Sequence, residues 1–213
     1  MSGIFISIEG PEGSGKTTLI NALVPKLKSS SRADIIATRE PGGIKISEQI
    51  RRIILDPENS EMDARTEALL FAASRRQHLV EKVMPALEAD KLVIADRYVD
   101  SSLAYQGQAR KLGISVIAEL NEFATDGLLP QLTLLLDLDP ETGLKRIMQH
   151  RQDEINRIDM ESIAVHQLVR HGFLNVLELY PERIKKIDAR QTPDKILEEA
   201  YQLIVNRFPE NFK

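Results

Sequence analysis

The sequence predicts an α/β fold in which helices cover both faces of a five-stranded parallel sheet. Short apolar runs recur between longer segments with helical spacing, at residues 4–8, 35–38, 92–95, 132–136 and 184–187, and this alternation is typical of parallel sheets. The fourth run reads Leu-Thr-Leu-Leu-Leu, which is apolar on both sides, as a strand under two helical layers must be. With 213 residues, 42% of them hydrophobic, we expect a single domain over residues 1–213.

The predicted helices are bounded by recognisable signals. Pro140 and Pro193 stand at the first turns of helices expected over 141–149 and 194–205, where a missing N–H costs nothing. A long helix is predicted from residue 62 to about 84, and we expect it to end at Pro85. Further helices are predicted over 18–28 and 162–179.

Charge and cysteine content limit the partners and the compartment. The formal net charge is −4, so nothing draws the whole molecule to nucleic acid or to an anionic membrane, and we expect neither partner. The chain has no cysteine, which excludes thiolate chemistry and favours a reducing, cytoplasmic setting. The apolar run that begins at residue 4 stops at Glu9 and follows no basic residue, which does not fit a secretory signal.

Polar residues mark the ends of four predicted strands. Glu9, Arg39, Asp96 and Asp137 each follow an apolar run directly. Because parallel strands end at one edge of the sheet, these side chains should lie at the carboxyl edge, where open α/β sheets bind their ligands.

A glycine-rich stretch lies between the first predicted strand and the helix over 18–28. It reads Gly10-Pro11-Glu12-Gly13-Ser14-Gly15-Lys16-Thr17, with Thr18 following, and matches the phosphate loop of nucleoside triphosphate-binding proteins. We expect the loop amides and the helix N-terminus to hold the phosphates, and Lys16 to reach the β- and γ-phosphates. The Thr17 hydroxyl is expected to bind Mg²⁺. The fold is then a three-layer P-loop NTPase fold; the alternative is a flexible glycine turn.

Basic residues at the other strand ends point to a second phosphate. Asp96 follows an apolar strand, where P-loop proteins place a carboxylate that faces Mg²⁺. Arg97 beside it is suited to clamp the phosphate of a second substrate, although a surface ion pair with Asp96 is the alternative. Arg39 ends the second strand, and Arg51 lies on the helix that follows. Three arginines at one edge indicate an anionic ligand, against the alternative of separate surface cations.

Five segments together resemble the bacterial thymidylate kinases. They are residues 10–18, residues 39–43 (Arg-Glu-Pro-Gly-Gly), residues 70–75 (Leu-Phe-Ala-Ala-Ser-Arg), residues 96–98 (Asp-Arg-Tyr) and residues 100–107 (Asp-Ser-Ser-Leu-Ala-Tyr-Gln-Gly). The resemblance implies transfer of the γ-phosphoryl group of Mg-ATP to dTMP, giving dTDP for dTTP synthesis, with ATP as co-substrate and Mg²⁺ as cofactor. It also implies a homodimer.

The resemblance assigns roles to individual residues. Phe71 would stack on thymine while Arg75 bonds its carbonyl, and their spacing of one helical turn puts ring and guanidinium on one face. Without the resemblance, Phe71 would be interpreted as a core residue and Tyr105 as a packing residue. The resemblance also implies that Gln106 and Ser102 bind the pyrimidine edge and that Tyr105 excludes a 2′-hydroxyl. It implies that Glu12 binds the 3′-hydroxyl of the sugar. The monophosphate would be bound by Arg39, Arg51 and Arg97.

A lid is predicted over residues 150–159. The variable positions of the phosphate loop contain no cation, so positive charge for the transition state has to come from elsewhere. The polar stretch between two helices resembles the arginine-bearing lid of the bacterial enzymes, and Arg157 and then Arg151 are the candidates for phosphate contact. Arg146 is interpreted as a residue of the helix surface, and a solvated charged loop is the alternative for both lid arginines.

Two other functions remain open at this point. One is a P-loop kinase for a different nucleotide, nucleoside or small acid, which would not need Phe71 and Arg75 together. The other is a hydrolytic or non-enzymatic nucleotide switch, which should show a catalytic Gln or a guanine-reading Asn-Lys-x-Asp, and neither is visible.

Overall fold

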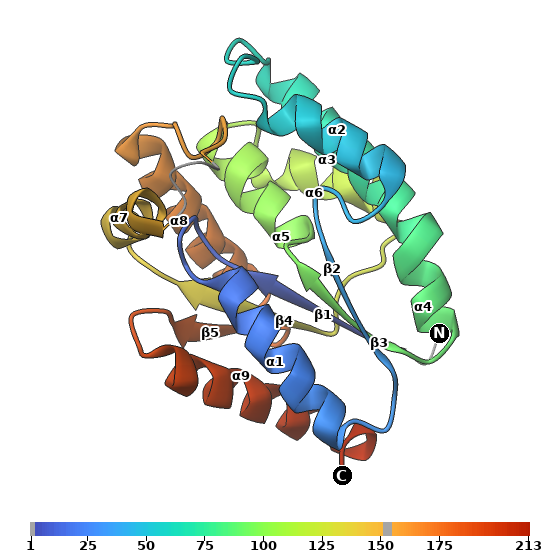
Figure 1. Ribbon diagram of the computed structural model, residues 1–213. Coiled ribbons are helices and arrows are strands. Elements are labelled where there is room, and N and C mark those ends of the chain that lie inside the picture. The colour runs from blue at the N-terminus through green and yellow to red at the C-terminus, as the bar shows by residue number, and fades with distance from the viewer. Residues whose placement is uncertain (1–2, 151–154) are drawn as a thin grey trace.

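The computed structural model describes residues 3–150 and 155–213, and its strands within that part of the chain form one five-stranded sheet (Figure 1). The spatial order is β2-β3-β1-β4-β5, and each neighbouring pair is parallel. The strands are β1 (Ile4–Glu9), β2 (Ile35–Arg39), β3 (Leu92–Asp96), β4 (Leu132–Asp137) and β5 (Ile184–Asp188). The predicted fold class is confirmed, and the polar residues expected at the strand ends are the last residues of β1 to β4.

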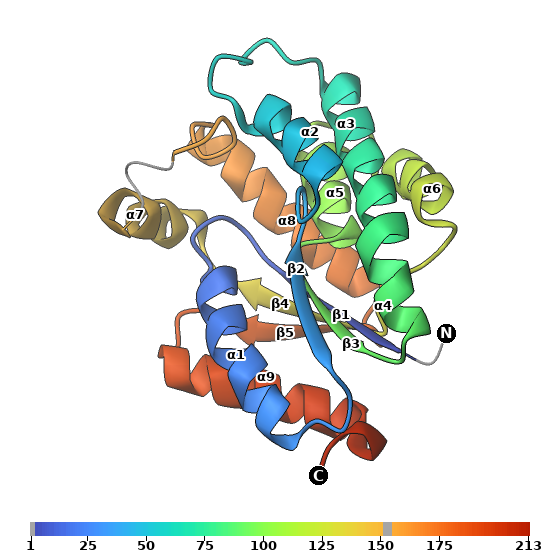
Figure 2. The same cartoon turned by 45° about the vertical axis from the view of Figure 1, so that its right-hand side comes forward.

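Helices cover both faces of the sheet, and each face has its own core. Helices α1 (Lys16–Ser30) and α9 (Pro193–Arg207) lie side by side on one face, while α3 (Ala64–His78), α6 (Ile114–Thr125) and α8 (Ile163–Leu179) lie on the other (Figures 1 and 2). Along β1, Ile4, Ile6 and Ile8 enter the first core and Phe5 the second. This alternation explains why the strands are apolar throughout.

The helix predicted to end at Pro85 continues beyond it. It begins at Ala64, capped by the Asp63 side chain, passes through a π-helical turn η1 (Leu79–Val83) and runs on as α4 (Met84–Glu88). Pro85 occupies the first turn of α4, where no N–H is required because the π turn shifts the hydrogen-bonding register just before it. The prediction was wrong because a proline at such a junction does not break a helix.

The remaining elements connect these layers. They are α2 (Lys45–Leu55), α5 (Val99–Ser102), the π-helical segment η2 (Leu103–Ala109), α7 (Pro140–His150) and the 3-10 turn η4 (Pro209–Asn211). Pro140 and Pro193 begin α7 and α9 as predicted, and Ser162 caps α8 through Val165 N. Among the described residues, no helix has the length and apolarity needed to cross a membrane.

Candidate active site

The glycine-rich loop leaves β1 and turns into α1. Gly13 has φ 69, and a Cβ at this position would lie 2.2 Å from the carbonyl oxygen of Gly143 on α7. Only glycine fits, because both the left-handed backbone and the contact with α7 exclude a side chain. Lys16 opens α1 and its Nζ donates to Gly10 O at 3.1 Å and Pro11 O at 2.9 Å. The loop therefore curls around the lysine side chain.

Lys16 carries its charge in a buried place. The side chain is buried, and its pKa falls to about 8, first because of burial and then because of the positive charge of Arg97. The acidic side chains of Glu12, Asp96 and Glu9 act in the opposite direction. Because the charged form of Lys16 is destabilised in this way, the site is suited to bind a polyanion, which would stabilise that charge.

Thr17 and Asp96 meet at the carboxyl edge of the sheet. The Thr17 hydroxyl donates to Asp96 Oδ2 at 2.9 Å, although the two residues are 79 positions apart. A hydroxyl and a carboxylate oxygen beside a phosphate loop are hard ligands of the kind that Mg²⁺ prefers. The donor set predicted from sequence for this ion is therefore brought together.

Three arginines predicted to bind a phosphate line the same cavity as Lys16, which has a volume of about 970 Å³. Arg51 Nη1 donates to Pro41 O at 2.9 Å, and Arg39 Nη2 donates to Glu48 at 2.8 Å. The pKa of Arg51 is lowered by burial and next by the positive charges of Arg39 and Arg97. Mutual repulsion of this kind indicates a site for an anion.

Arg97 is fixed in place from several sides. Its backbone has φ 69, a conformation that costs free energy for a non-glycine residue and is concentrated at functional sites. Its Nη1 donates to Gly10 O and to Ser101 Oγ, both at 3.0 Å. Ser101 in turn donates to Glu9 at 2.6 Å. Glu9, whose pKa is raised to about 7 by burial and by Asp100, thus supports Arg97 indirectly, a role the sequence reasoning did not assign.

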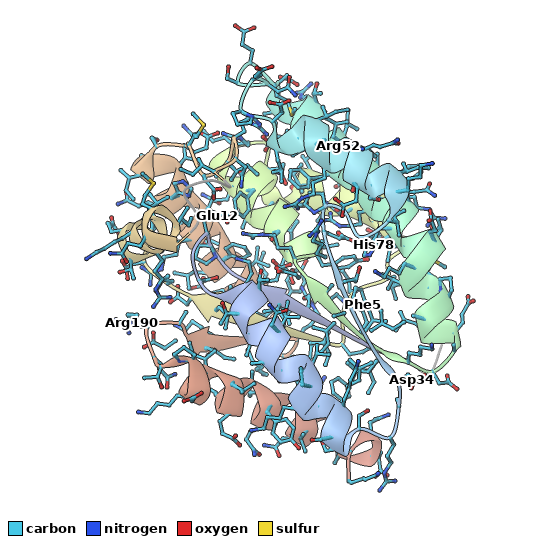
Figure 3. The ribbon with its side chains drawn as sticks, in the orientation of Figure 1. Phe5, Glu12, Asp34, Arg52, His78 and Arg190 are labelled. Carbon is cyan, nitrogen blue, oxygen red and sulfur yellow. The ribbon has the colours of Figure 1, made fainter. Side chains whose placement is uncertain are left out.

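Glu12 links the phosphate loop to Tyr105, the residue predicted to exclude a 2′-hydroxyl and called the sugar gate below. Its Oε1 accepts hydrogen bonds from Arg97 Nη2 at 2.8 Å and from the Tyr105 hydroxyl at 2.7 Å, and Figure 3 shows Glu12 on the loop between β1 and α1. Although burial opposes it, the negative charges of Glu12 and Glu9 raise the pKa of Arg97 above its usual value. Arg97 thereby balances the negative charge of the Glu12 carboxylate, which explains how the phosphate loop tolerates an acidic residue.

The predicted base-binding residues gather at one end of the cavity. Phe71, Arg75, Ser102, Tyr105 and Gln106 all line it. The last three lie on α5 and on η2, which is π-helical. Tyr98 precedes this helix with an extended φ of −157°. Its ring packs edge-on against Phe5, with ring centroids 4.8 Å apart.

Arg75 is buried and held by a polar network that sequence reasoning missed. Its Nε donates to Glu40 Oε2 at 2.7 Å and its Nη1 to Ser102 Oγ at 3.0 Å, and Asn121 accepts a further bond. Glu40 also pairs with His78 Nδ1 at 2.9 Å, and His78 lies on α3 (Figure 3). The sequence contained a signal for this network, because Glu40 belongs to the Arg-Glu-Pro-Gly-Gly segment and His78 lies one helical turn beyond Arg75.

The structure describes one of the two lid arginines predicted from sequence. Arg151 falls outside the described residues. Arg157 is buried away from the cavity lining, with Nε on Ile54 O at 2.9 Å and Nη2 on Glu67 Oε2 at 2.5 Å. In this conformation a buried carboxylate on α3 holds the Arg157 guanidinium, so the phosphate contact predicted for Arg157 stays a prediction.

Arg146 corrects a further prediction. It was interpreted as a helix-surface residue, yet it lines the cavity and donates to Gly13 O at 3.4 Å and to Ala189 O at 3.1 Å. The helix periodicity of α7 does not reveal this, because α7 packs against the phosphate loop through Gly143. The sequence alone also left unassigned the far end of the cavity, lined by Gln191, Asp194 and Leu197 among others.

A family model described as thymidylate kinase matches residues 8–200. The chain belongs to the thymidylate kinase family. It is 55% identical to the thymidylate kinase of Enterococcus faecalis over 212 residues, which is 100% of both chains. It is 57% identical to that of Clostridium novyi over 198 residues, covering 93% of this chain and 96% of the relative. Among solved structures, the thymidylate kinase of Ehrlichia chaffeensis matches with a TM-score of 0.75 at 28% identity, covering 96% of this chain and 99% of that one.

Proposed function

We propose that this member of the thymidylate kinase family transfers the γ-phosphoryl group of Mg-ATP to dTMP, which yields dTDP for dTTP synthesis. One observation carries the proposal: a single cavity is lined by the phosphate loop with Lys16, by Arg39, Arg51 and Arg97, and by the base-binding group around Phe71. A donor triphosphate and an acceptor monophosphate in one cavity are brought end to end, which is the arrangement that phosphoryl transfer needs.

The transfer requires no protein base. An oxygen of the dTMP phosphate, already a dianion for the most part at neutral pH because its second pKa is about 6, attacks the γ-phosphorus of ATP. The bond from that phosphorus to the β–γ bridging oxygen breaks, and ADP leaves with the electron pair. The protein's part is to position both phosphates and to neutralise negative charge, through Lys16 at the donor and Arg97 at the acceptor.

For the acceptor we propose the contacts predicted from sequence. Phe71 stacks on the thymine ring, Arg75, Ser102 and Gln106 bind its polar edge, and Arg39, Arg51 and Arg97 bind the monophosphate. Tyr105 and Glu12 form a hydrogen-bonded pair beside Arg97, which supports assigning the 3′-hydroxyl to Glu12 and the exclusion of a 2′-hydroxyl to Tyr105.

Mg²⁺ fits the donor set of Thr17 and Asp96. Their oxygens lie within 2.9 Å of each other at the end of the phosphate loop, and Mg²⁺ typically takes one or two protein ligands and fills its other positions with phosphates and water. When bound, the ion neutralises charge on the β- and γ-phosphates.

We assign residues 150–159 to a lid within a single domain of residues 1–213. Arg151 keeps the role predicted from sequence, whereas contact of Arg157 with the phosphoryl group would require its buried pair with Glu67 to break. Arg146, which lines the cavity beside Gly13, is the better supported cation for the donor phosphates or base.

We also propose a cytoplasmic homodimer. A homodimer is supported by apolar side chains that lie exposed on α3 and α6, with Phe123 at 85%, Leu69 at 58% and Val116 at 56% exposure. Large apolar side chains left exposed on two neighbouring helices are typical of a protein–protein contact. The reducing compartment is supported by the absence of cysteine from the sequence.

The test is ADP formation from ATP and Mg²⁺ with dTMP, dUMP, UMP, dCMP, AMP and GMP as acceptors. Turnover that strongly favours dTMP supports both the base pocket and the sugar gate. Preference for another acceptor would identify a different P-loop kinase, and slow hydrolysis independent of acceptor would leave only the phosphate loop.

A further inference from the structure

Gln106 presents one end of its amide to a buried carboxylate. Gln106 lies on η2, is 1% exposed and lines the cavity next to Ser102 and Arg75. Its Nε2 donates to Glu67 Oε1 at 2.8 Å. In the described part of the chain, no hydrogen bond to Gln106 Oε1 is present, so the amide oxygen remains available on the cavity side.

Glu67 is held as an ionised acceptor. Its carboxylate, buried on α3, receives Arg157 Nη2 at 2.5 Å and Arg110 Nη2 at 3.2 Å. Burial alone would raise the pKa of Glu67, but the hydrogen bonds and charge of Arg110, with Gln106 and Arg157, lower it below its usual value. An ionised carboxylate accepts hydrogen bonds and donates none, so it must face the amide nitrogen of Gln106 rather than the amide oxygen.

The carboxylate has little freedom to move. Arg157 is tied to α2 by its own backbone N on Leu55 O at 3.0 Å and by Nε on Ile54 O at 2.9 Å. Arg110 is tied to Glu161 at 2.5 Å on the other side. Two anchored guanidinium groups thus fix Glu67, and Glu67 fixes the orientation of the Gln106 amide.

We propose that Glu67 is a specificity-positioning residue, which orients the Gln106 amide so that its oxygen accepts a hydrogen bond from the N3–H of a 4-oxo pyrimidine. The inference deepens the proposed function. Thymine and uracil carry a proton at N3, whereas cytosine has only a lone pair there, and that lone pair would face the amide oxygen. An amide free to rotate would present its NH₂ to cytosine and lose this discrimination.

The test compares dTMP with 5-methyl-dCMP, a pair that differs only at N3 and C4 of the base. The ratio of kcat/KM for the two nucleotides is measured for the wild type and for Glu67→Gln, whose side-chain amide can donate to Gln106 Oε1 and turn the Gln106 amide around. We expect the ratio to fall at least about tenfold, through a higher KM for dTMP and a gain with 5-methyl-dCMP, while KM for ATP stays unchanged.

Glu161→Gln is the matched control, because Glu161 binds the same Arg110 but does not contact Gln106. It should keep the wild-type ratio, and a fall as large as that of Glu67→Gln would overturn the proposal. The ratio is independent of the fraction of molecules that fold.

Glu67→Asp covers the case in which Glu67→Gln does not fold. It keeps a negative charge for the two arginines but withdraws the carboxylate from Gln106, so its ratio should also fall. A folded Glu67 variant with a ratio within twofold of the wild type overturns the inference, while a wild type that does not phosphorylate dTMP overturns the proposed function instead.

Discussion

Replacing Lys16 with Met should change how the stability of the ligand-free protein depends on pH. Lys16 is 8% exposed, and its pKa is about 8 in the folded protein against an ordinary 10.5, mainly because it is buried and next because of Arg97. Below pH 8 the lysine is protonated in both the folded and the unfolded chain, and the folded state carries the cost of the buried charge.

The magnitude follows from linkage. Between pH 8 and 10.5 the folded protein has released this proton while the unfolded chain still binds it, so the free energy of unfolding rises with pH. The two pKa values, at about 1.4 kcal/mol per pH unit, correspond to about 3 kcal/mol in full. Most of it, about 2 kcal/mol or more, is gained by pH 10. The Lys16→Met protein lacks this gain.

The assay is urea unfolding of both proteins without nucleotide at pH 7, 8, 9 and 10. The quantity compared is the unfolding free energy of the wild type minus that of Lys16→Met, since Tyr98 and Tyr105 titrate in both proteins and largely cancel. Lys28→Met, which removes an exposed lysine from the same helix, is the matched control. We expect the Lys16 difference to rise by about 2 to 3 kcal/mol over this range, and the Lys28 difference to change far less.

If the unfolding free energy of the wild type minus that of Lys16→Met stays constant between pH 7 and 10, the prediction is refuted. It would mean that the carbonyl groups of Gly10 and Pro11, together with Glu12, compensate the buried charge fully. The binding of a non-hydrolysable ATP analogue gives a second reading, because a triphosphate that raises the pKa of Lys16 must bind more weakly as the pH rises above about 8.

Three further predictions concern the reaction itself. Lys16→Ala should lower kcat at least about 100-fold with an unchanged circular dichroism spectrum, and a folded variant that retains turnover would contradict the phosphate-loop assignment. Tyr105→Ala should relax the selection of dUMP over UMP, because the side chain that pairs with Glu12 at 2.7 Å is removed; an unchanged ratio would reject the sugar-gate role. Thr17→Val should raise the Mg²⁺ concentration needed for half-maximal rate at saturating ATP, whereas unaltered Mg²⁺ dependence would mean that this hydroxyl does not bind the ion.

Local signals were sufficient to predict the fold and the phosphate loop. Strands apolar on both faces are recognisable in sequence because they have to be covered on both sides. The loop is equally local, since the glycines, Lys16 and Thr17 are consecutive and their chemistry depends on backbone geometry within a few residues. The carboxyl-edge position of Arg39 and Asp96 followed from the rule that parallel strands end together.

Other features depend on which elements pack together, and only the tertiary structure decided them. The π turn before Pro85 depends on how the adjacent helical turns are hydrogen-bonded. Residue propensity therefore did not predict that the helix continues past this proline. Arg146 faces the cavity because Gly143 packs on the phosphate loop, and Arg157 turns away because Glu67, 90 positions distant in the chain, provides a buried partner. Long flexible side chains such as arginine can reach several sites, so their position is set by the partner that the fold brings near and not by their own place in the sequence.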